Sequence, residues 1–396
     1  MHSTANPFRI HGTVTGSYFA NREAEVERIA RALDEPGSKV LVYGPRRMGK
    51  TSAIRVAIER VEQEGGRAFL ADLSTASTVA DMANRILEAA ARTLGKRWKD
   101  LPTEFVRRLG VSLRMEPDPG TGLILPSLDL RLRSAPVEDQ RRTLGQVLDV
   151  LNQLAESRKH SLGVVLDEFQ EIHRFGGEEA EWHLRGVIQN HDHMAYILAG
   201  SHEHLVRRML GKGRAFYRLL DPLPFGPIDP VTLARWIDER MSEAGLEAQA
   251  GDRCVHLAGP RTRDIVQLAR KTYDLASTRG TAGPDDVYRA FREVVEEEDE
   301  LIRTLWEGLT SQSQNVLRAA AGSAQGLTTA ATMERYSLRS SGTTSNAAKS
   351  LVADGLLVKT RSGYAFDSPF VRGWVVLHTL PDVGIHLDLT SPPVEP

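Results

Sequence analysis

Residues 40–51 read Val40-Leu41-Val42-Tyr43-Gly44-Pro45-Arg46-Arg47-Met48-Gly49-Lys50-Thr51, and they indicate the fold class. The first four form a short apolar run typical of a buried strand, and the rest match G-x-x-x-x-G-K-[ST] without a mismatch. The apolar residues that follow recur at the spacing of an amphipathic helix: Ile54, Ala57, Ile58 and Val61. A strand, a glycine-bounded loop and a helix in this order are the context that a phosphate-binding loop requires.

The chemistry of this loop follows from its residue types. Gly44 and Gly49 let the backbone bend and approach phosphates closely, so that successive N–H groups turn inward. The following helix adds the positive end of its dipole. We expect Lys50 to bridge the β- and γ-phosphates of a nucleotide and the Thr51 hydroxyl to ligate Mg²⁺. The predicted phosphate-binding residues are Gly44, Pro45, Arg46, Arg47, Met48, Gly49, Lys50, Thr51 and Ser52.

A second apolar run, residues 162–166, ends in two carboxylates, Asp167 and Glu168. In phosphate-loop proteins an acid at this place holds Mg²⁺, and we expect Asp167 to do so. Glu168 can polarise the attacking water as a general base. Alone, the two acids could simply mark a strand that leaves the core. Together with the phosphate loop they indicate a nucleotide hydrolase and not merely a nucleotide binder.

Strand and helix patterns alternate in the first part of the chain, which indicates a parallel α/β sheet with crossover helices. Further strands are predicted at residues 68–71 and 195–199. A helix with Asn21 as its N-cap is predicted around residues 26–33. Further helices are predicted over 79–94 and 144–154, and a helix-rich stretch to about residue 109.

Other patterns depart from this alternation. Residues 111–115 and 128–132 alternate apolar and polar side chains around a Pro/Gly-rich turn at 117–120, which predicts a hairpin or an excursion from the main sheet. After Pro230 the strand patterns stop, and residues 230–295 are predicted to be helical.

Composition excludes several classes of protein. Lys+Arg total 50 and Asp+Glu total 52, so the net charge of −2 excludes nucleic-acid binding by bulk charge, although a local basic patch is compatible with it. The single cysteine, Cys254, excludes an intramolecular disulfide, and we expect it to be a small buried residue. No apolar run approaches the ~20 residues of a membrane span, and the first residues do not resemble a signal peptide. We therefore expect a cytoplasmic protein without membrane contact.

These motifs resemble those of AAA+-type ATPases, in the group that contains the archaeal ATPases and the signal-transduction (STAND) ATPases. Residues 18–25, Tyr-Phe-Ala-Asn-Arg-Glu-Ala-Glu, are similar to the N-terminal segment of that family, with Asn21 where a glycine is usual. Residues 164–171 resemble its Asp-Glu-Phe-Gln strand end. Residues 197–201, Ile-Leu-Ala-Gly-Ser, resemble its next strand, which ends in a polar sensor residue. The resemblance covers about residues 6–290.

The resemblance implies a sheet ordered 5-1-4-3-2, a small helical lid, and ATP bound between core and lid. It implies that Ser201 is the sensor that contacts the γ-phosphate or the water, although Ser201 could instead cap a helix beginning at His202. Tyr18 and Phe19 would lie near the adenine.

The resemblance also suggests two arginine roles. Arg214 or Arg218 would be the finger that AAA+ rings insert into a neighbouring subunit, which would require a homo-oligomer. STAND proteins often lack such a finger, and then both residues would be surface charge. Arg261, with Arg263 as the alternative, would be the lid residue that senses the γ-phosphate.

The last part of the chain looks like a winged helix, with helices over 327–338 and 341–357 and a hairpin over 357–365. The second helix is predicted to expose Thr343, Thr344, Ser345, Asn346 and Lys349. Its inward face is predicted to carry Ala347, Ala348, Leu351, Val352 and Leu356. Residues 301–380 hold eight basic and four acidic side chains, a balance of +4 that suits weak phosphate contacts. Winged helices bind either double-stranded DNA or proteins, and both partners stay open.

Two histidine pairs, at residues 191/193 and 202/204, lack zinc-type spacing, and we expect no metal there. The expected organisation is a phosphate-loop ATPase core over 1–228, a helical lid over 229–295, a winged-helix domain over 296–380 and a tail over 381–396. The expected function is Mg²⁺-dependent ATP hydrolysis that drives a switch or the assembly of a winged-helix module. The alternatives are a nucleotide-binding regulator or scaffold with negligible turnover, and an ATPase active only as an oligomer.

Overall fold

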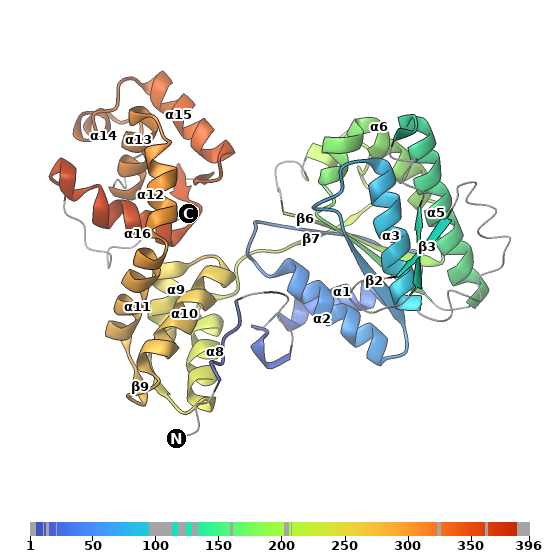
Figure 1. Cartoon of the computed structure of the whole chain (residues 1–396), viewed down its shortest axis with the longest axis horizontal. Helices are drawn as coiled ribbons and strands as arrows, with labels where there is room; N and C mark the ends of the chain where they lie inside the picture. The colour runs from blue at the N-terminus through green and yellow to red at the C-terminus, as the bar shows by residue number, and fades with distance from the viewer. Residues whose placement is uncertain are drawn as a thin grey trace. The chain divides into compact units, whose positions relative to one another are not determined.

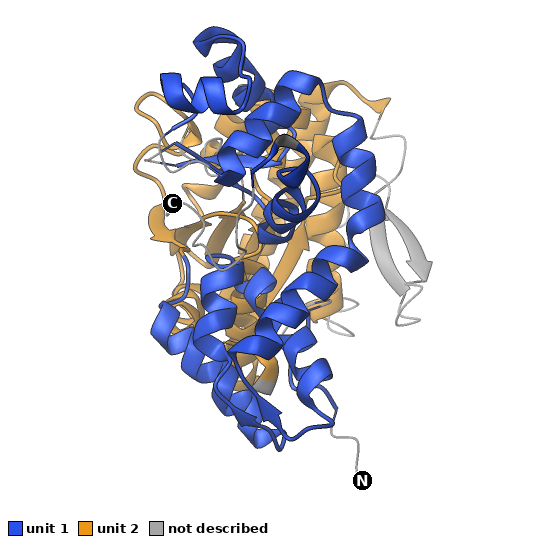
Figure 2. Ribbon diagram, turned by 90° about the vertical axis from the view of Figure 1, so that its left-hand side faces the viewer, with its two compact units in different colours: residues 1–12, 227–396 blue, residues 13–226 orange. Residues whose placement is uncertain are grey.

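The computed structural model describes residues 5–10, 12, 16–20, 22–94, 113–117, 124–128, 134–158, 161–201, 206, 208–322, 326–360 and 363–385. The chain divides into two compact units (Figure 2): residues 13–226, and residues 1–12 with 227–396. Within the described residues, no helix combines the length and the apolar character that crossing a bilayer requires.

The first unit is built on a parallel sheet of five described strands: β1 (Lys39–Tyr43), β2 (Arg67–Asp72), β5 (Leu162–Asp167), β6 (Met194–Gly200) and β7 (Asp221–Pro224). Their spatial order is β2-β5-β6-β1-β7. Numbered by position along the chain and read from the other edge, this is the predicted order 5-1-4-3-2, which is confirmed. Tyr43 lies opposite Gly200, and Asp72 opposite Asp167, so the carboxyl ends of the strands form one edge.

Helices cover both faces of this sheet (Figure 1). The helices are α1 (Glu23–Asp34), α2 (Lys50–Gln63), α3 (Val79–Leu94), α5 (Val137–Arg158) and α6 (Glu171–Ile188). Val40 and Val42 of β1 pack with α1 and α2, whereas Leu41 packs in the cluster that contains α3, α5 and α6. Because successive side chains of a strand point to opposite faces, this alternation places the sheet between the two helical layers. All residues of β5 and β6 are buried for that reason.

Two parts of the first unit differ from expectation. The edge strand β7, Asp-Pro-Leu-Pro, was not predicted, because proline lacks the N–H that a central strand needs; an edge strand with one partner tolerates it. The predicted hairpin is confirmed as antiparallel β3 (Leu113–Pro117) and β4 (Ile124–Leu128), but its second strand lies earlier than residues 128–132. Its turn and residues 95–112 lie outside the described residues. The predicted N-cap of the first helix is wrong: the N-cap of α1 is Arg22 and not Asn21, because the helix begins at Glu23.

The second unit begins with the helices α8 (Pro230–Glu243), α9 (Gly251–Ala258), α10 (Thr262–Ala276) and α11 (Pro284–Glu297). They carry a short parallel pair that was not predicted, β8 (Glu247–Ala248) with β9 (Thr281–Ala282). Residues 1–12 belong to this second unit, whereas the predicted boundaries placed them in the ATPase core. The Phe8 and Trp236 rings are 5.7 Å apart, and Arg270 donates a 3.1 Å hydrogen bond to the carbonyl of Phe8.

The rest of the second unit has the helix–helix–hairpin order expected of a winged helix. It comprises α12 (Asp299–Glu307), α13 (Ser311–Gly322), α14 (Ala330–Arg335), α15 (Ser341–Ala353), antiparallel β10 (Leu357–Lys359) and β11 (Tyr364–Phe366), α16 (Pro369–His378) and the 3₁₀ turn η4 (Pro381–Val383). On α15, Thr343, Asn346 and Lys349 are exposed as predicted.

The predicted exposure of Thr344 is wrong. Its side chain is fully buried and accepts a 3.2 Å hydrogen bond from Gln312 of α13, because the first turns of α15 pack against that helix. Ser345 on the same helix is half-buried. Among the residues predicted to face inward, Ala347, Val352 and Leu356 are half-buried instead of buried.

Candidate functional site

The loop between β1 and α2 has the backbone that its glycines permit. Gly49 adopts φ 88°, in the left-handed region, and Gly44 adopts φ 158°. A Cβ atom on Gly44 would lie 2.2 Å from the carbonyl oxygen of Phe225, directly after β7. The N–H of Phe225 in turn donates a 2.7 Å hydrogen bond to the carbonyl of Tyr43. The start of the loop is therefore held by close backbone contact with the edge strand.

Lys50 is the buried cation of this loop. Its Nζ donates hydrogen bonds to the carbonyl oxygens of Gly44 at 2.9 Å and Pro45 at 2.7 Å. Burial lowers the pKa of Lys50 to about 8, although the carboxylates of Glu168 and Asp167 act in the opposite direction. Because carbonyl oxygens carry no net charge, they do not neutralise this ammonium, which can therefore attract an anion that enters the loop.

Thr51 and Asp167, the two predicted Mg²⁺ ligands, are in direct contact. The Thr51 hydroxyl donates a 2.7 Å hydrogen bond to Oδ2 of Asp167, across 116 residues of sequence. Burial raises the pKa of Asp167, and the hydrogen bond from Thr51 partly opposes that shift. A divalent cation would offset the cost of this buried negative charge. A hydroxyl and one carboxylate, completed by substrate phosphates, are the donors that Mg²⁺ takes in such sites, so these residues fit it.

Glu168 lies at the same edge, where β5 ends. Its backbone has φ 52°, in the left-handed region that non-glycine residues rarely adopt. Its Oε2 accepts a 2.7 Å hydrogen bond from the Ser201 hydroxyl, at the end of β6, and a 2.5 Å bond from Nε2 of Gln170. The hydroxyl of Ser201 accepts a 3.4 Å bond from Nε of Arg46 in the phosphate loop. The predicted base, sensor and loop therefore form one connected group; the helix start that Ser201 would otherwise cap lies outside the described residues.

Arg22 is a buried residue of the site that the sequence reasoning did not single out. Its Nη2 donates to the carbonyls of Met48 at 3.1 Å and Gly226 at 2.6 Å, and its guanidinium lies 4.1 Å from the centre of the Phe225 ring. It thus connects the phosphate loop to the segment that follows β7. The only sequence signal was its place in the Asn-Arg-Glu segment of the resemblance.

The predicted adenine neighbours, Tyr18 and Phe19, lie four and three residues before this arginine. Tyr18 ends the 3₁₀ turn η1 (Gly16–Tyr18), and both Tyr18 and Phe19 are half-buried. Phe19 packs against the apolar cluster formed by α1, α2 and one face of the sheet.

The two candidate finger arginines differ in their surroundings. Arg214 forms ion pairs with two carboxylates of α6, Glu178 and, at 3.7 Å, Glu181. Arg218 is exposed, with its guanidinium 5.3 Å from the centre of the Tyr217 ring. Arg214 is thus engaged within its own chain, whereas Arg218 is accessible.

Arg261, the predicted lid sensor, lies directly before α10 and is bound within its own unit. Its guanidinium donates to both carboxylate oxygens and to the carbonyl of Asp367, which follows β11 of the winged helix. The side chain of Arg261 is 9% exposed and that of Asp367 26%. The alternative, Arg263, is exposed. In this structure Arg261 therefore joins α10 to the winged-helix hairpin.

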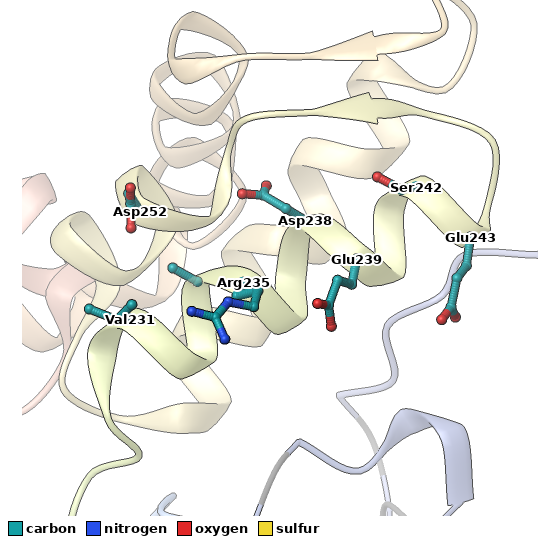
Figure 3. A pocket seen from close by; sticks show the side chains of 8 residues that line it. Val231, Arg235, Asp238, Glu239, Ser242, Glu243 and Asp252 are labelled. Carbon is teal, nitrogen blue, oxygen red and sulfur yellow. The ribbon is translucent and has the colours of Figure 1, made fainter.

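The helices α8 and α9 border a cavity of about 590 Å³ in which none of the predicted site residues takes part (Figure 3). Its lining residues are Val231, Ala234, Arg235, Asp238, Glu239, Ser242, Glu243 and Asp252. Oδ1 of Asp238 accepts 2.9 Å hydrogen bonds from the N–H groups of Ala250 and Gly251. This carboxylate therefore closes the start of α9, which is a structural role.

The remaining candidates are the two histidine pairs and Cys254. Nδ1 of His191 lies 2.6 Å from the Tyr196 hydroxyl oxygen, and Nε2 of His191 lies 2.9 Å from Oδ1 of Asp149. His202 and His204 lie outside the described residues, and in the described part no group of three or more His, Cys, Asp or Glu side chains is placed to hold a metal ion. Cys254 is buried, which raises the pKa of its thiol to about 12.

Comparison with known proteins identifies two families of domains in this sequence. A family profile described as an ATPase domain predominantly from Archaea matches residues 19–228, and one described as a probable winged helix domain matches residues 301–376. The first match spans more than half of the sequence, and the chain belongs to that family of ATPase domains. Nucleotide binding and hydrolysis are the activity that this membership supports.

Solved structures share the fold at low sequence identity. A Walker-type ATPase of Pyrococcus abyssi is 17% identical, with a TM-score of 0.61 over 93% of this chain and 99% of that one. The ORC2 protein of Aeropyrum pernix, in ADPNP and ADP complexes, is 17% identical, with a TM-score of 0.50 over 87% of this chain and 88% of that one. A search of curated proteins found no significant match.

Proposed function

We propose that this protein is a Mg²⁺-dependent ATPase of the AAA+/STAND type whose hydrolysis of ATP switches or assembles a winged-helix module. The observation that carries the proposal is the meeting of five side chains at the carboxyl ends of neighbouring strands. Lys50 and Thr51 lie where the phosphate loop enters α2, Asp167 ends β5 and Glu168 follows it, and Ser201 follows β6. Such an edge of a parallel sheet is where open α/β folds bind ligands.

In the proposed binding step, the loop of residues 44–52 and the N-terminus of α2 receive the phosphates of ATP. Lys50 pairs with the β- and γ-phosphates, and Tyr18 and Phe19 contact the adenine. Thr51 and Asp167 would hold Mg²⁺, which supplies neutralisation of phosphate charge when bound.

In the hydrolysis step, Glu168 accepts a proton from a water molecule as that oxygen attacks the γ-phosphorus. The bond between the γ-phosphorus and the β–γ bridging oxygen breaks, so that ADP leaves and inorganic phosphate forms. Ser201 acts as the sensor, because its hydroxyl bonds to Glu168 and it also accepts from Arg46 of the loop.

The variant Glu168→Gln tests this assignment. An amide cannot take the proton, so we expect phosphate release to fall by about a hundredfold or more while ATP binding persists. Glu179→Gln, which removes an exposed partner of Arg141, is the matched control and should keep full activity. Unchanged phosphate release in Glu168→Gln would overturn the catalytic assignment. A wild-type chain that binds ATP without releasing phosphate would identify the nucleotide-binding scaffold instead.

For the winged helix we propose double-stranded DNA as the partner, bound by the exposed side of α15. Thr343, Asn346 and Lys349 are exposed on this helix. The local balance of +4 provides only weak attraction to phosphates, so binding should weaken strongly with salt. Phosphate release with and without duplex DNA, at two salt concentrations, tests the proposal. No stimulation and no DNA binding at either concentration would favour a protein partner.

For transmission to the winged helix we propose the ion pair between Arg261 and Asp367. It connects the start of α10 with the end of β11, so a movement of α10 would displace the hairpin. Of the two finger candidates we propose Arg218, because Arg214 is bonded to Glu178. If Arg218 completes a neighbouring site in a homo-oligomer, wild-type turnover per chain rises with protein concentration, and turnover of Arg218→Ala does not.

A further inference from the structure

We infer that Gln170 is a positioning residue for hydrolysis, which orients the carboxylate of Glu168 toward the attacking water. This inference rests on the proposed role of Glu168 as the general base. It adds a residue to which the sequence reasoning gave no role.

The contacts of the Glu168 carboxylate carry the inference. Nε2 of Gln170 and the hydroxyl of Ser201 both donate to the same oxygen, Oε2, at 2.5 and 2.7 Å. Two donors on one oxygen fix the rotation of the carboxylate plane. They thereby direct the other oxygen, Oε1, which we assign to the water. Both donors are neutral, so they orient the base without adding a full positive charge that would weaken it.

The surroundings of Gln170 restrict its amide to this orientation. The residue is 1% exposed. A Cβ atom on Gly200, the last residue of β6, would lie 2.8 Å from Oε1 of Gln170, so the amide packs directly against that strand. The N–H of Phe169 donates a 2.8 Å hydrogen bond to the carbonyl of Ala199 and fixes the intervening backbone on β6.

A purely structural role for Gln170 would be to cap α6, which begins at the next residue. The position of Gln170 is the N-cap of that helix, but its side chain makes no capping hydrogen bond. The amide is turned to Glu168 instead, whose left-handed backbone (φ 52°) is a conformation that persists only when neighbouring contacts impose it. The hydrogen bond from Gln170 therefore connects this buried amide directly to the proposed base.

The test replaces Gln170 by Leu, which keeps most of its volume but removes the donor, and by Glu, which keeps its shape. Both variants should lower kcat on the order of a hundredfold, because a misplaced base loses its alignment with the water. The Kd of a fluorescent ATP analogue should stay within about twofold, because Gln170 is not placed on the phosphates.

Gln140→Leu is the matched control in the same unit. Gln140 is also a buried glutamine, and its amide accepts from the N–H of Ala80 at 3.2 Å and donates to the carbonyl of Ala135 at 2.9 Å. This control should lower thermal stability at least as much as Gln170→Leu, while kcat stays at the wild-type value. Equal losses of kcat in the two variants would show that Gln170 acts only through stability and would overturn the inference.

A double variant separates this inference from the proposed function. In a Glu168→Gln background, Gln170→Leu should lower the residual kcat no further, since the base that it positions is gone. A further loss of the same factor would place the effect of Gln170 elsewhere and overturn the inference. If Glu168→Gln alone keeps wild-type turnover, the proposed function fails. If Glu168→Gln is inactive and Gln170→Leu is fully active, only the role of Gln170 fails.

Discussion

The predicted nucleotide site in residues 13–226 and the start of α10 in residues 227–396 bury charge in different ways. In the first region, Lys50 is hydrogen-bonded to backbone carbonyls and Asp167 to a hydroxyl, so the direct hydrogen-bond partners of these two buried charges are neutral. In the second region, the buried Arg261 is bonded to a carboxylate, Asp367. Charge left without an opposite partner in direct contact costs stability but is ready for a ligand, whereas charge paired internally fixes structure. The first arrangement suits binding and chemistry, and the second suits rigid connection.

The largest effect that this comparison predicts is that of Lys50→Ala. In the proposed function Lys50 presents its charge to the phosphates, so its loss should reduce ATP turnover by about a hundredfold or more. Lys39→Ala is the matched control, since Lys39 also bonds to two carbonyls, those of Gly37 and His191, but at the other end of β1. Phosphate release and nucleotide titration measure both variants. Wild-type turnover and ATP affinity in Lys50→Ala would contradict the assignment of the phosphate loop.

The variant Asp167→Asn should separate activity from stability. Burial raises the pKa of Asp167, so the charged form costs stability at pH 7, and this cost shrinks as the pH falls and the carboxyl is protonated. Without nucleotide, the neutral amide should therefore melt at the same or a higher temperature than the wild type.

With ATP and Mg²⁺, the same Asp167→Asn variant should lose turnover about a hundredfold, and chelation of Mg²⁺ should do the same to the wild type. Thermal melting and phosphate release are the two measurements. If Asp167→Asn is less stable than the wild type and fully active, Asp167 serves stability and not activity, and the contrast drawn between the two regions is wrong.

In the second region, the variant Asp367→Ala should act mainly on stability. It leaves the buried guanidinium of Arg261 without its carboxylate, so we expect a loss of about 3 kcal/mol in the free energy of unfolding. Asp354→Asn, an exposed position after α15, should change it by less than about 0.5 kcal/mol. Chemical denaturation measures both. Equal stability of the two variants would show that the ion pair does not fix the hairpin.

A smaller effect is expected on α15, where a buried and an exposed threonine are neighbours. Thr344→Val loses the hydrogen bond from Gln312 and should cost about 1 kcal/mol of stability. Because the Thr343 hydroxyl also caps α15, Lys349→Ala, at an exposed position of the same helix, is the comparison for DNA binding and should weaken that binding more than Thr344→Val does. The same effect of both substitutions on duplex affinity would argue against the exposed side of α15 as the binding surface.

The sequence predicts those parts of the molecule that depend on neighbours in the chain. The phosphate loop lies in one stretch of residues, and Asp167 and Glu168 follow an apolar run that any strand prediction finds. The order of the sheet came from the family resemblance, since nothing local in the sequence specifies which strands pair. The strand β7 was not predicted because its two prolines oppose strand formation. Its pairing with β1 stabilises it in the structure.

The contacts that sequence reasoning missed join distant segments. Arg22 meets Gly226 across 204 positions, and Arg261 meets Asp367 across 106. Gln170 is close to Glu168 in sequence, but its role depends on Gly200, which packs against its amide. The exposure of Thr344 was mispredicted because helical periodicity alone does not say how much of α15 the helix α13 covers.

The close approach of Phe225 to Gly44 gives that glycine a second constraint. A side chain there would collide with a carbonyl of the edge segment whether or not the loop ever receives a phosphate. In a related protein that no longer binds nucleotides, substitutions of Lys50 and Glu168 would be tolerated. Gly44 would still be required, because of its packing against Phe225. A glycine at this position in such a protein would therefore reflect the fold and would not indicate ATPase activity.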